Sequence, residues 1–348
     1  MKTITYCLLS LLLFAVAACT SSPLPADPLL HFAGKKEKLL KVSQKYDLEK
    51  YGIYRPSDIH KKDNLYILRD ISDDSTVKIW NTTTDKVYKG VPKGNGPNEV
   101  VLLGGIQLQD DQILLYDIQR KSIKEMVLSE ASSTIKLTEK RKLSETDRPF
   151  IIANRGENIV ASGLFRTSWI NYYDSDNKLL SSLDFPVFAE QEQLTELEKS
   201  MVYLSTLLTI KPDQSKVACA TKCGAVISIS ECDSDKLTEI VQLNYFPAEV
   251  ETNQFTGVAY TKNHKTGFCD IACDDEFIYV LYSGRTRESH GLDTHYCRYL
   301  LKYDWNGNPI TRFEFEVPLF SMDYDPNTKL LYGVGNDPEG CILIYNIG

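Results

Sequence analysis

The stretch CDIACDDEFIYV at positions 269–280 contains two short apolar runs on either side of an acidic turn. Two such runs joined by a tight polar turn predict an antiparallel hairpin. The same unit recurs five times, and every copy has Asp, Asn, Gly or Pro in its turn. The first strands of these other copies are expected at 58–60, 106–108, 150–153, 207–210 and 320–324.

A third and a fourth strand follow the hairpin in most copies. The third tends to end in Tyr, Trp or Asp, as at 77–80, 169–174 and 300–304, and a fourth is expected at 311–317. Four antiparallel strands repeated at roughly 45 to 60 residues are typical of propeller blades. The sequence therefore predicts an all-β fold, a six-bladed β-propeller over residues 35–348. A seven-bladed ring or a pair of β-sandwiches is the alternative.

The two ends of the repeat region predict how the ring closes. The last copy stops after its third strand, at 341–345, and the segment Lys38–Tyr46 before the first copy has the pattern of a strand. We expect this N-terminal strand to complete the last blade, because the pairing would cover two exposed sheet edges at once.

The N-terminus has the layout of a secretory leader. Lys2 precedes the apolar run Leu8–Phe14, and Val16-Ala17-Ala18-Cys19 resembles a bacterial lipobox. We therefore predict a signal peptide over 1–18, a lipid on Cys19 and a Pro- and Ser-rich tether over 19–34. The alternative is an ordinary signal peptide with an accidental cysteine. Residue 20 is Thr rather than Asp, and no acidic cluster follows, which favours the outer membrane, facing the periplasm.

Charge and cysteine content narrow the possible partners and cross-links. The formal net charge is -8, with no basic run, so nucleic acid is not expected as a partner. Besides Cys7 and Cys19 there are seven cysteines, among them the pairs Cys219/Cys223 and Cys269/Cys273. Four residues along a strand span roughly 13 Å, so neither pair should form an internal disulfide. The spacing is also poor for zinc, and we expect small core residues.

One segment departs from the strand pattern. Leu194, Leu197 and Met201 are spaced as on one face of a short amphipathic helix over Glu190–Tyr203. We expect this helix between blades three and four, as a packed surface insertion rather than a lid.

The loop before the second blade contains the sequence KGNGPNE at positions 93–99. It resembles the Gly-x-Gly-Pro-x-Glu signature of the TolB-like six-bladed propeller lipoproteins of Bacteroidetes, with Asn98 and Val100 departing from the usual residues. The resemblance implies a membrane-tethered propeller and supplies no catalytic residues. Asn95 and Glu99 are candidates for ligand contact. The structural alternative is that Glu99 accepts backbone N–H groups, with Gly94 and Gly96 supplying the necessary conformations.

The loops that enter the blades share one face of a propeller, which is its usual binding surface. Two of these loops contain Arg-Pro, at Arg55-Pro56 and Arg148-Pro149. Arg55 and Arg148 could hold an anionic ligand through bidentate contacts. Alternatively, each pairs with a neighbouring acid such as Asp58 or Asp147.

Blade five carries the weak metal-ligand candidates His264, His290, Asp293 and His295 in loops expected on that same face. A metal held there would permit a hydrolase of lactone or glycan substrates. No nucleophile elbow, zinc-protease or phosphate-loop motif is present, and no motif specifies a cofactor or catalytic residue. The favoured function is therefore a non-enzymatic, monomeric binding module for a protein or glycan partner, with the metal-dependent hydrolase as the alternative.

Overall fold

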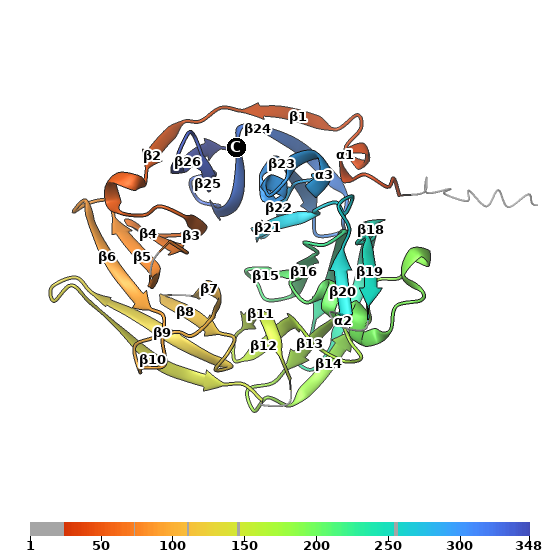
Figure 1. Ribbon diagram of the computed structural model, residues 1–348, viewed down its shortest axis with the longest axis horizontal. Coiled ribbons are helices and arrows are strands. Elements are labelled where there is room, and N and C mark those ends of the chain that lie inside the picture. The colour runs from red at the N-terminus through yellow and green to blue at the C-terminus, as the bar shows by residue number, and fades with distance from the viewer. Residues whose placement is uncertain (1–23, 73, 110, 145–146, 254–256) are drawn as a thin grey trace, which may run out of the picture.

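The computed structural model describes residues 24–72, 74–109, 111–144, 147–253 and 257–348. Their strands form a ring of blades around a central axis (Figure 1). The first four blades are separate four-stranded antiparallel sheets. From the axis outward their strands are β3 (Pro56–Lys62), β4 (Leu65–Asp70), β5 (Ser75–Asn81) and β6 (Lys86–Pro92); β7 (Leu103–Gln109), β8 (Gln112–Asp117), β9 (Ser122–Ser129) and β10 (Thr134–Lys142); β11 (Pro149–Arg155), β12 (Asn158–Gly163), β13 (Ile170–Tyr173) and β14 (Leu179–Leu183); β15 (Leu207–Ile210), β16 (Lys216–Ala220), β17 (Ala225–Cys232) and β18 (Leu237–Phe246).

Blades five and six share one strand, β24 (Pro309–Asp325). Its first half pairs with β23 (Cys297–Asp304), and its second half pairs with β25 (Leu330–Asn336). The strand is therefore the fourth strand of blade five and the innermost of blade six. Blade five begins with β21 (Phe268–Cys273) and β22 (Phe277–Tyr282), and blade six continues with β26 (Gly340–Asn346). The six predicted hairpins and the six-bladed fold are confirmed.

The N-terminal chain closes the ring with two strands instead of the single predicted one. β2 (Gln44–Asp47) pairs antiparallel with β26 and completes blade six, as expected. β1 (Lys36–Leu40) instead pairs in parallel with β24, on the outer edge of blade five. The prediction of one continuous strand over 38–46 was therefore wrong, because the chain passes from blade five to blade six between β1 and β2. A short 3-10 turn, η1 (Glu49–Tyr51), then leads into blade one.

Part of the segment predicted as a tether packs on the propeller. The side chain of Asp27 caps α1 (Pro28–His31), and Phe32 is 0% exposed. Phe32 lies against Tyr303 of blade five, with ring centroids 5.0 Å apart, and His31 Nδ1 is 2.8 Å from the Tyr245 hydroxyl. The tether assignment for 19–34 is thus wrong for these residues. The leader and Cys19 lie outside the described residues.

The predicted helix between blades three and four is present but shorter. A 3-10 turn, η2 (Ala189–Gln191), precedes α2 (Glu196–Tyr203), which begins with a capping box between Thr195 and Glu198. Leu197 was expected to face the core but is 50% exposed. A hairpin that the sequence did not predict, β19 (Val250–Asn253) and β20 (Gly257–Tyr260), packs beside α2, and Tyr260 donates a hydrogen bond to the Val202 carbonyl at 3.3 Å.

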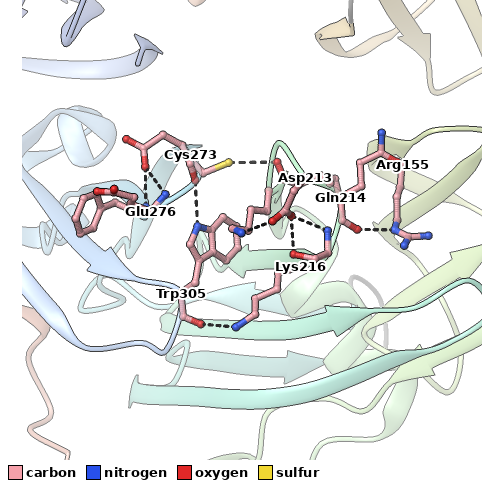
Figure 2. A network of polar contacts seen from close by, with 12 residues as sticks. Arg155, Asp213, Gln214, Lys216, Cys273, Glu276 and Trp305 are labelled. Carbon is pink, nitrogen blue, oxygen red and sulfur yellow. Dashed lines mark hydrogen bonds and ion pairs between the residues drawn. The ribbon is translucent and has the colours of Figure 1, made fainter. Parts of the chain in front are cut away.

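Polar side chains join neighbouring blades on the side of their inner hairpin turns (Figure 2). Arg155 of blade three donates to the Gln214 carbonyl at 2.8 Å, and Lys216 of blade four donates to the Trp305 carbonyl at 3.3 Å. The Cys273 thiol donates to the Ile210 carbonyl at 3.2 Å. These contacts satisfy backbone carbonyls in or beside the turns between strands. All seven described cysteines are free, so the predicted absence of Cys219–Cys223 and Cys269–Cys273 bridges is confirmed.

Candidate functional site

Three connected cavities follow the axis of the ring. The mouth, of about 420 Å³, is lined among others by Tyr54, Arg55, Lys222, Tyr296, Phe320 and Asn336. The throat, of about 220 Å³, is lined among others by Asp58, His60, Arg69, Gly105, Asp270 and Ser321. The base, of about 520 Å³, is lined among others by Gln107, Thr209, Cys273 and Asp323. Mouth and throat share Lys222 and Phe320, while throat and base share His60 and Asp270, so the three are continuous.

A buried ion pair in blade one holds the loop that carries Arg55. Asp70, at the end of β4, accepts hydrogen bonds from the backbone N–H groups of Tyr54 and Arg55, both at 3.2 Å. Lys78 on β5 lies 2.7 Å from Asp70, and both side chains are 0% exposed. Burial disfavours the charged carboxyl, but hydrogen bonds from Lys78 and Ser72 outweigh this and lower the pKa of Asp70. The backbone that carries the Arg55 side chain is therefore held in place by Asp70.

In blade two an aspartate also holds the entering loop through its backbone N–H groups, whereas blade three has no aspartate at this place. Asp117, at the end of β8, accepts the N–H groups of Val101 and Leu102 at 3.0 and 3.3 Å. Gly163 ends β12 at the matching place, and a Cβ there would lie 2.3 Å from the Arg148 carbonyl. An Asp closing the second strand of a repeat is a signal that the sequence reasoning did not use.

The throat gathers charged side chains from three different strands. In the register of β3 and β4, Asp58 lies opposite Arg69, which places both on one face of the sheet. His60 Nε2 is 3.5 Å from Asp58 Oδ2, with the two side chains 21% and 25% exposed. Ser321 Oγ is 3.1 Å from Asp58 and 2.8 Å from Asp270. Because a hydroxyl has one proton, it can donate to only one of these carboxylates at a time.

The pKa values in the throat follow from this crowding. Burial by itself disfavours the imidazolium of His60, but the carboxylates of Asp58, Asp323 and Asp270 raise its pKa to about 9. Burial and the neighbouring Asp58 raise the pKa of Asp270 to about 6. At neutral pH the histidine is therefore a cation, and Asp270 is mostly ionised but close to the pH at which it takes up a proton.

Several polar side chains of the channel join one inner strand to the next. Asp323 of blade six accepts the Lys61 N–H at 2.7 Å, and Asp270 of blade five accepts the Met322 N–H at 2.8 Å. Gln107 of blade two accepts the Asn154 N–H at 3.2 Å. These three side chains therefore have a structural role. The side chains of His60 and Arg69 have no such contact, and His60 Nε2 and Arg69 Nε are buried without a hydrogen-bond partner in the described part of the chain.

The predicted ligand contacts separate into two groups. Arg55 lines the mouth, and its side chain shows neither of the acidic partners considered as alternatives. Arg148 is exposed but does not line any of the three cavities. Asn95 and Glu99 do not line them either. His60, Arg69 and Lys222 were missed. Polar residues at alternate positions of an inner strand are a signal that could have found His60, whereas Arg69 lies on the second strand, β4, and Lys222 in a loop.

The loop with the Gly-x-Gly-Pro-x-Glu pattern is held together by its own glutamate. Glu99 accepts the Gly96 N–H at 2.5 Å, and a Cβ at position 94 would lie 2.1 Å from its Oε2. Asn98 accepts the Leu137 N–H of β10 at 3.0 Å, and Lys124 donates to the Glu99 carbonyl at 2.7 Å. The expectation that Glu99 accepts a backbone N–H group is confirmed.

The four metal-ligand candidates have separate surroundings. His264 Nδ1 faces the Glu249 N–H at 3.3 Å, and His290 Nδ1 is 2.7 Å from the Ser289 hydroxyl at the end of α3 (Arg287–His290). Asp293 and His295 lie in the 3-10 turn η3 (Asp293–His295), where the His295 ring packs on Phe320, with centroids 5.8 Å apart. Within the described ranges, no group of three or more His, Cys, Asp or Glu is placed to hold a metal ion.

Fold and channel together define a six-bladed β-propeller with an axial cavity. The chain belongs to the TolB-like six-bladed propeller family, whose model matches residues 33–327. A crystal structure of a Bacteroides fragilis protein thought to be exported is similar, with 12% identity, a TM-score of 0.54, and coverage of 89% of this chain and 98% of that one. A DUF4221 family member from Bacteroides vulgatus shows 10% identity and a TM-score of 0.49 over 88% and 97%. These likenesses concern the fold alone.

Neither the curated proteins nor the helices that the structure describes add a further assignment. No curated protein shows a significant match to this sequence. No helix among the described residues is long and apolar enough to cross a bilayer.

Proposed function

We propose that this protein is a lipid-anchored envelope protein whose propeller binds a small anionic ligand at the mouth of its channel, without catalysis. The observation that carries this proposal is the pair of cations in the mouth. Arg55 enters from blade one and Lys222 from the loop after β16 of blade four. Neither side chain has a hydrogen bond or ion pair with a described residue. Two unpaired cations on opposite walls of one cavity attract an anion.

The rest of the mouth supplies a rigid aromatic wall. The Tyr296 and Phe320 rings meet edge to face, with centroids 5.4 Å apart and an interplanar angle of 81°. The Tyr296 hydroxyl accepts a hydrogen bond from Asn336 Nδ2. A cavity of about 420 Å³ falls within the range of roughly 300–1,000 Å³ typical of small-molecule sites. The mouth therefore suits an anionic group attached to a ring.

The anchoring part of the proposal rests on the leader-like N-terminus and its Cys19. The test is metabolic labelling with a palmitate analogue in a bacterial host that processes lipoproteins. We expect label in the wild-type chain and none after Cys19→Ala. Label that persists in the variant would contradict lipidation at this residue, and secretion without label would favour an ordinary signal peptide. Separation of the membranes then tests the expected outer-membrane location.

Ligand binding at the mouth is tested by calorimetry with cyclohexanecarboxylate and its neutral amide. We expect the acid to bind and the amide to bind at least tenfold more weakly. Arg55→Gln and Lys222→Gln should each weaken the acid by about tenfold or more, because a hydrogen bond to a charged group contributes about 1.5–3 kcal/mol. Arg148→Gln is the matched control, since Arg148 occupies the same kind of loop outside the cavities. Equal binding of acid and amide, or equal loss in all three variants, would refute an anion site.

A further inference from the structure

The throat beneath the mouth has a surplus of hydrogen-bond donors. His60 and Arg69 both line it, and neither side chain donates a hydrogen bond to a described residue. A buried donor without a partner costs about 1–3 kcal/mol. The nearby carboxylates act on His60 and Arg69 through their charge, and no described residue accepts a hydrogen bond from His60 Nε2 or Arg69 Nε. These N–H groups are therefore available to an acceptor that enters the throat.

The acidic groups around them are, by contrast, already in use. Asp270 accepts the N–H groups of Ile271 and Met322, and Asp323 accepts those of Lys61 and Tyr324. Each oxygen of these two carboxylates therefore already accepts one backbone hydrogen bond and has capacity for a second. A molecule that fits the throat should therefore bring acceptor oxygens for His60 and Arg69, and the described residues offer no set of three ligands to a metal ion.

The balance of charges in the throat decides whether the acceptor should be charged or uncharged. The throat is lined by two carboxyl groups, those of Asp58 and Asp270, and by three cations, His60, Arg69 and Lys222. When Lys222 binds the anion in the mouth, two carboxyl groups and two cations remain in the throat, so an uncharged oxygen is favoured over a second anion. Hydroxyl groups also donate, which lets them bond to the carboxylates beside the cations. The throat therefore suits hydroxyl groups, and the mouth above it suits an anion.

We propose that the throat binds the hydroxylated ring of an acidic saccharide whose carboxylate lies in the mouth between Arg55 and Lys222. This inference rests on the proposed anion site and extends it to a class of ligand. Room for the ring exists on the wall formed by β7, where a Cβ at Gly105 would have no neighbour within 4 Å. Buried waters could satisfy the same donors in the empty protein, and the ligand would then replace them.

The test compares two ring carboxylates, D-glucuronate and cyclohexanecarboxylate, by calorimetry on the mature chain. We expect glucuronate to bind at least tenfold more tightly, because only its hydroxyls can use the throat. Arg69→Met and His60→Asn should each remove most of this advantage and leave the affinity for cyclohexanecarboxylate unchanged. Retained binding of that probe shows that the variants are folded.

A variant that only fills space tests the same inference without removing a buried charge, so it applies even if the charge variants fail to fold. Gly105→Val adds bulk where the structure has open space and leaves every charge in place. We expect it to abolish the glucuronate advantage as well. Equal affinity for the two carboxylates, both lost in Arg55→Gln, would overturn the saccharide inference and keep the anion site. Glucose binding as tightly as glucuronate, with dependence on Arg69, would keep the throat site and refute the anion site.

Discussion

Replacing Lys78 with Met tests whether a buried ion pair sets the position of the mouth. The change removes one partner of a 2.7 Å pair in which both side chains are 0% exposed. It leaves the Asp70 carboxylate, which also accepts the N–H groups of Tyr54 and Arg55, charged and buried. Breaking such a pair costs about 3–5 kcal/mol. We expect Lys78→Met to lower the free energy of unfolding by that amount at pH 7, measured by urea denaturation.

The matched control is Lys140→Met. Lys140 pairs with Glu125 at 3.3 Å on the surface, where its side chain is 44% exposed. An exposed pair is worth about 0–1 kcal/mol, so this variant should be close to wild type. The refuting result is a Lys78 variant as mild as the Lys140 variant.

The pH dependence separates lost charge from lost packing. The folded-state pKa of Asp70 is lowered, so its charged form contributes stability above the unfolded pKa of about 3.9, and this is lost as the pH falls. Without Lys78, we expect burial to outweigh the remaining hydrogen bonds from Ser72 and to raise the pKa of Asp70 above its wild-type value. The cost of Lys78→Met should therefore shrink between pH 7 and pH 4.5, as the carboxyl takes up a proton. A cost independent of pH would mean that packing alone was lost.

Three further predictions concern other parts of the molecule. Gly94→Ala should destabilise by about 1–3 kcal/mol in urea, because its Cβ would lie 2.1 Å from Glu99, and Glu99→Ala should then relieve the clash. Thr195→Ala should cost about 0.5–2 kcal/mol by removing a helix cap, with hydrogen exchange faster in the helix that follows. The His60 ring should titrate near pH 9 by NMR, and Asp58→Asn should lower that midpoint. Because its folded pKa is raised, the stability it contributes should be complete below about pH 6.5 and lost as the pH rises through 9.

Local sequence patterns predicted the repeating part of this fold. The inner hairpins depend on turn chemistry and strand periodicity within about ten residues, and these are visible without any knowledge of distant contacts. The parallel pairing of Lys36–Leu40 with β24 joins segments far apart in the chain, and the prediction missed it. The continuous strand Pro309–Asp325 was also missed, since an outer and an inner strand were expected to be separate.

The site could be predicted only in outline. Arg55 was found because an Arg-Pro pair in a blade-entering loop is a local signal, and the structure places it in the mouth. Arg148 carries the same signal but lies outside the cavities. Tyr296 and Phe320 come from different blades, and no pattern in the sequence brings them together before the ring is closed. The orientation of Arg69 depends on its register with Asp58, which only strand pairing decides.

The alternation of side chains in the innermost strands explains why one channel can be both scaffold and site. Along β3, Ile59 is 0% exposed and faces the core, while Asp58 and His60 on either side face the axis. A polar side chain on the axis is needed for stability when it reaches a backbone N–H group of the next strand, as Asp323 does. His60 and Arg69 reach no such group, so the blade junctions do not account for them. In the proposed complex, the ligand that enters from the mouth would accept these hydrogen bonds in place of buried waters.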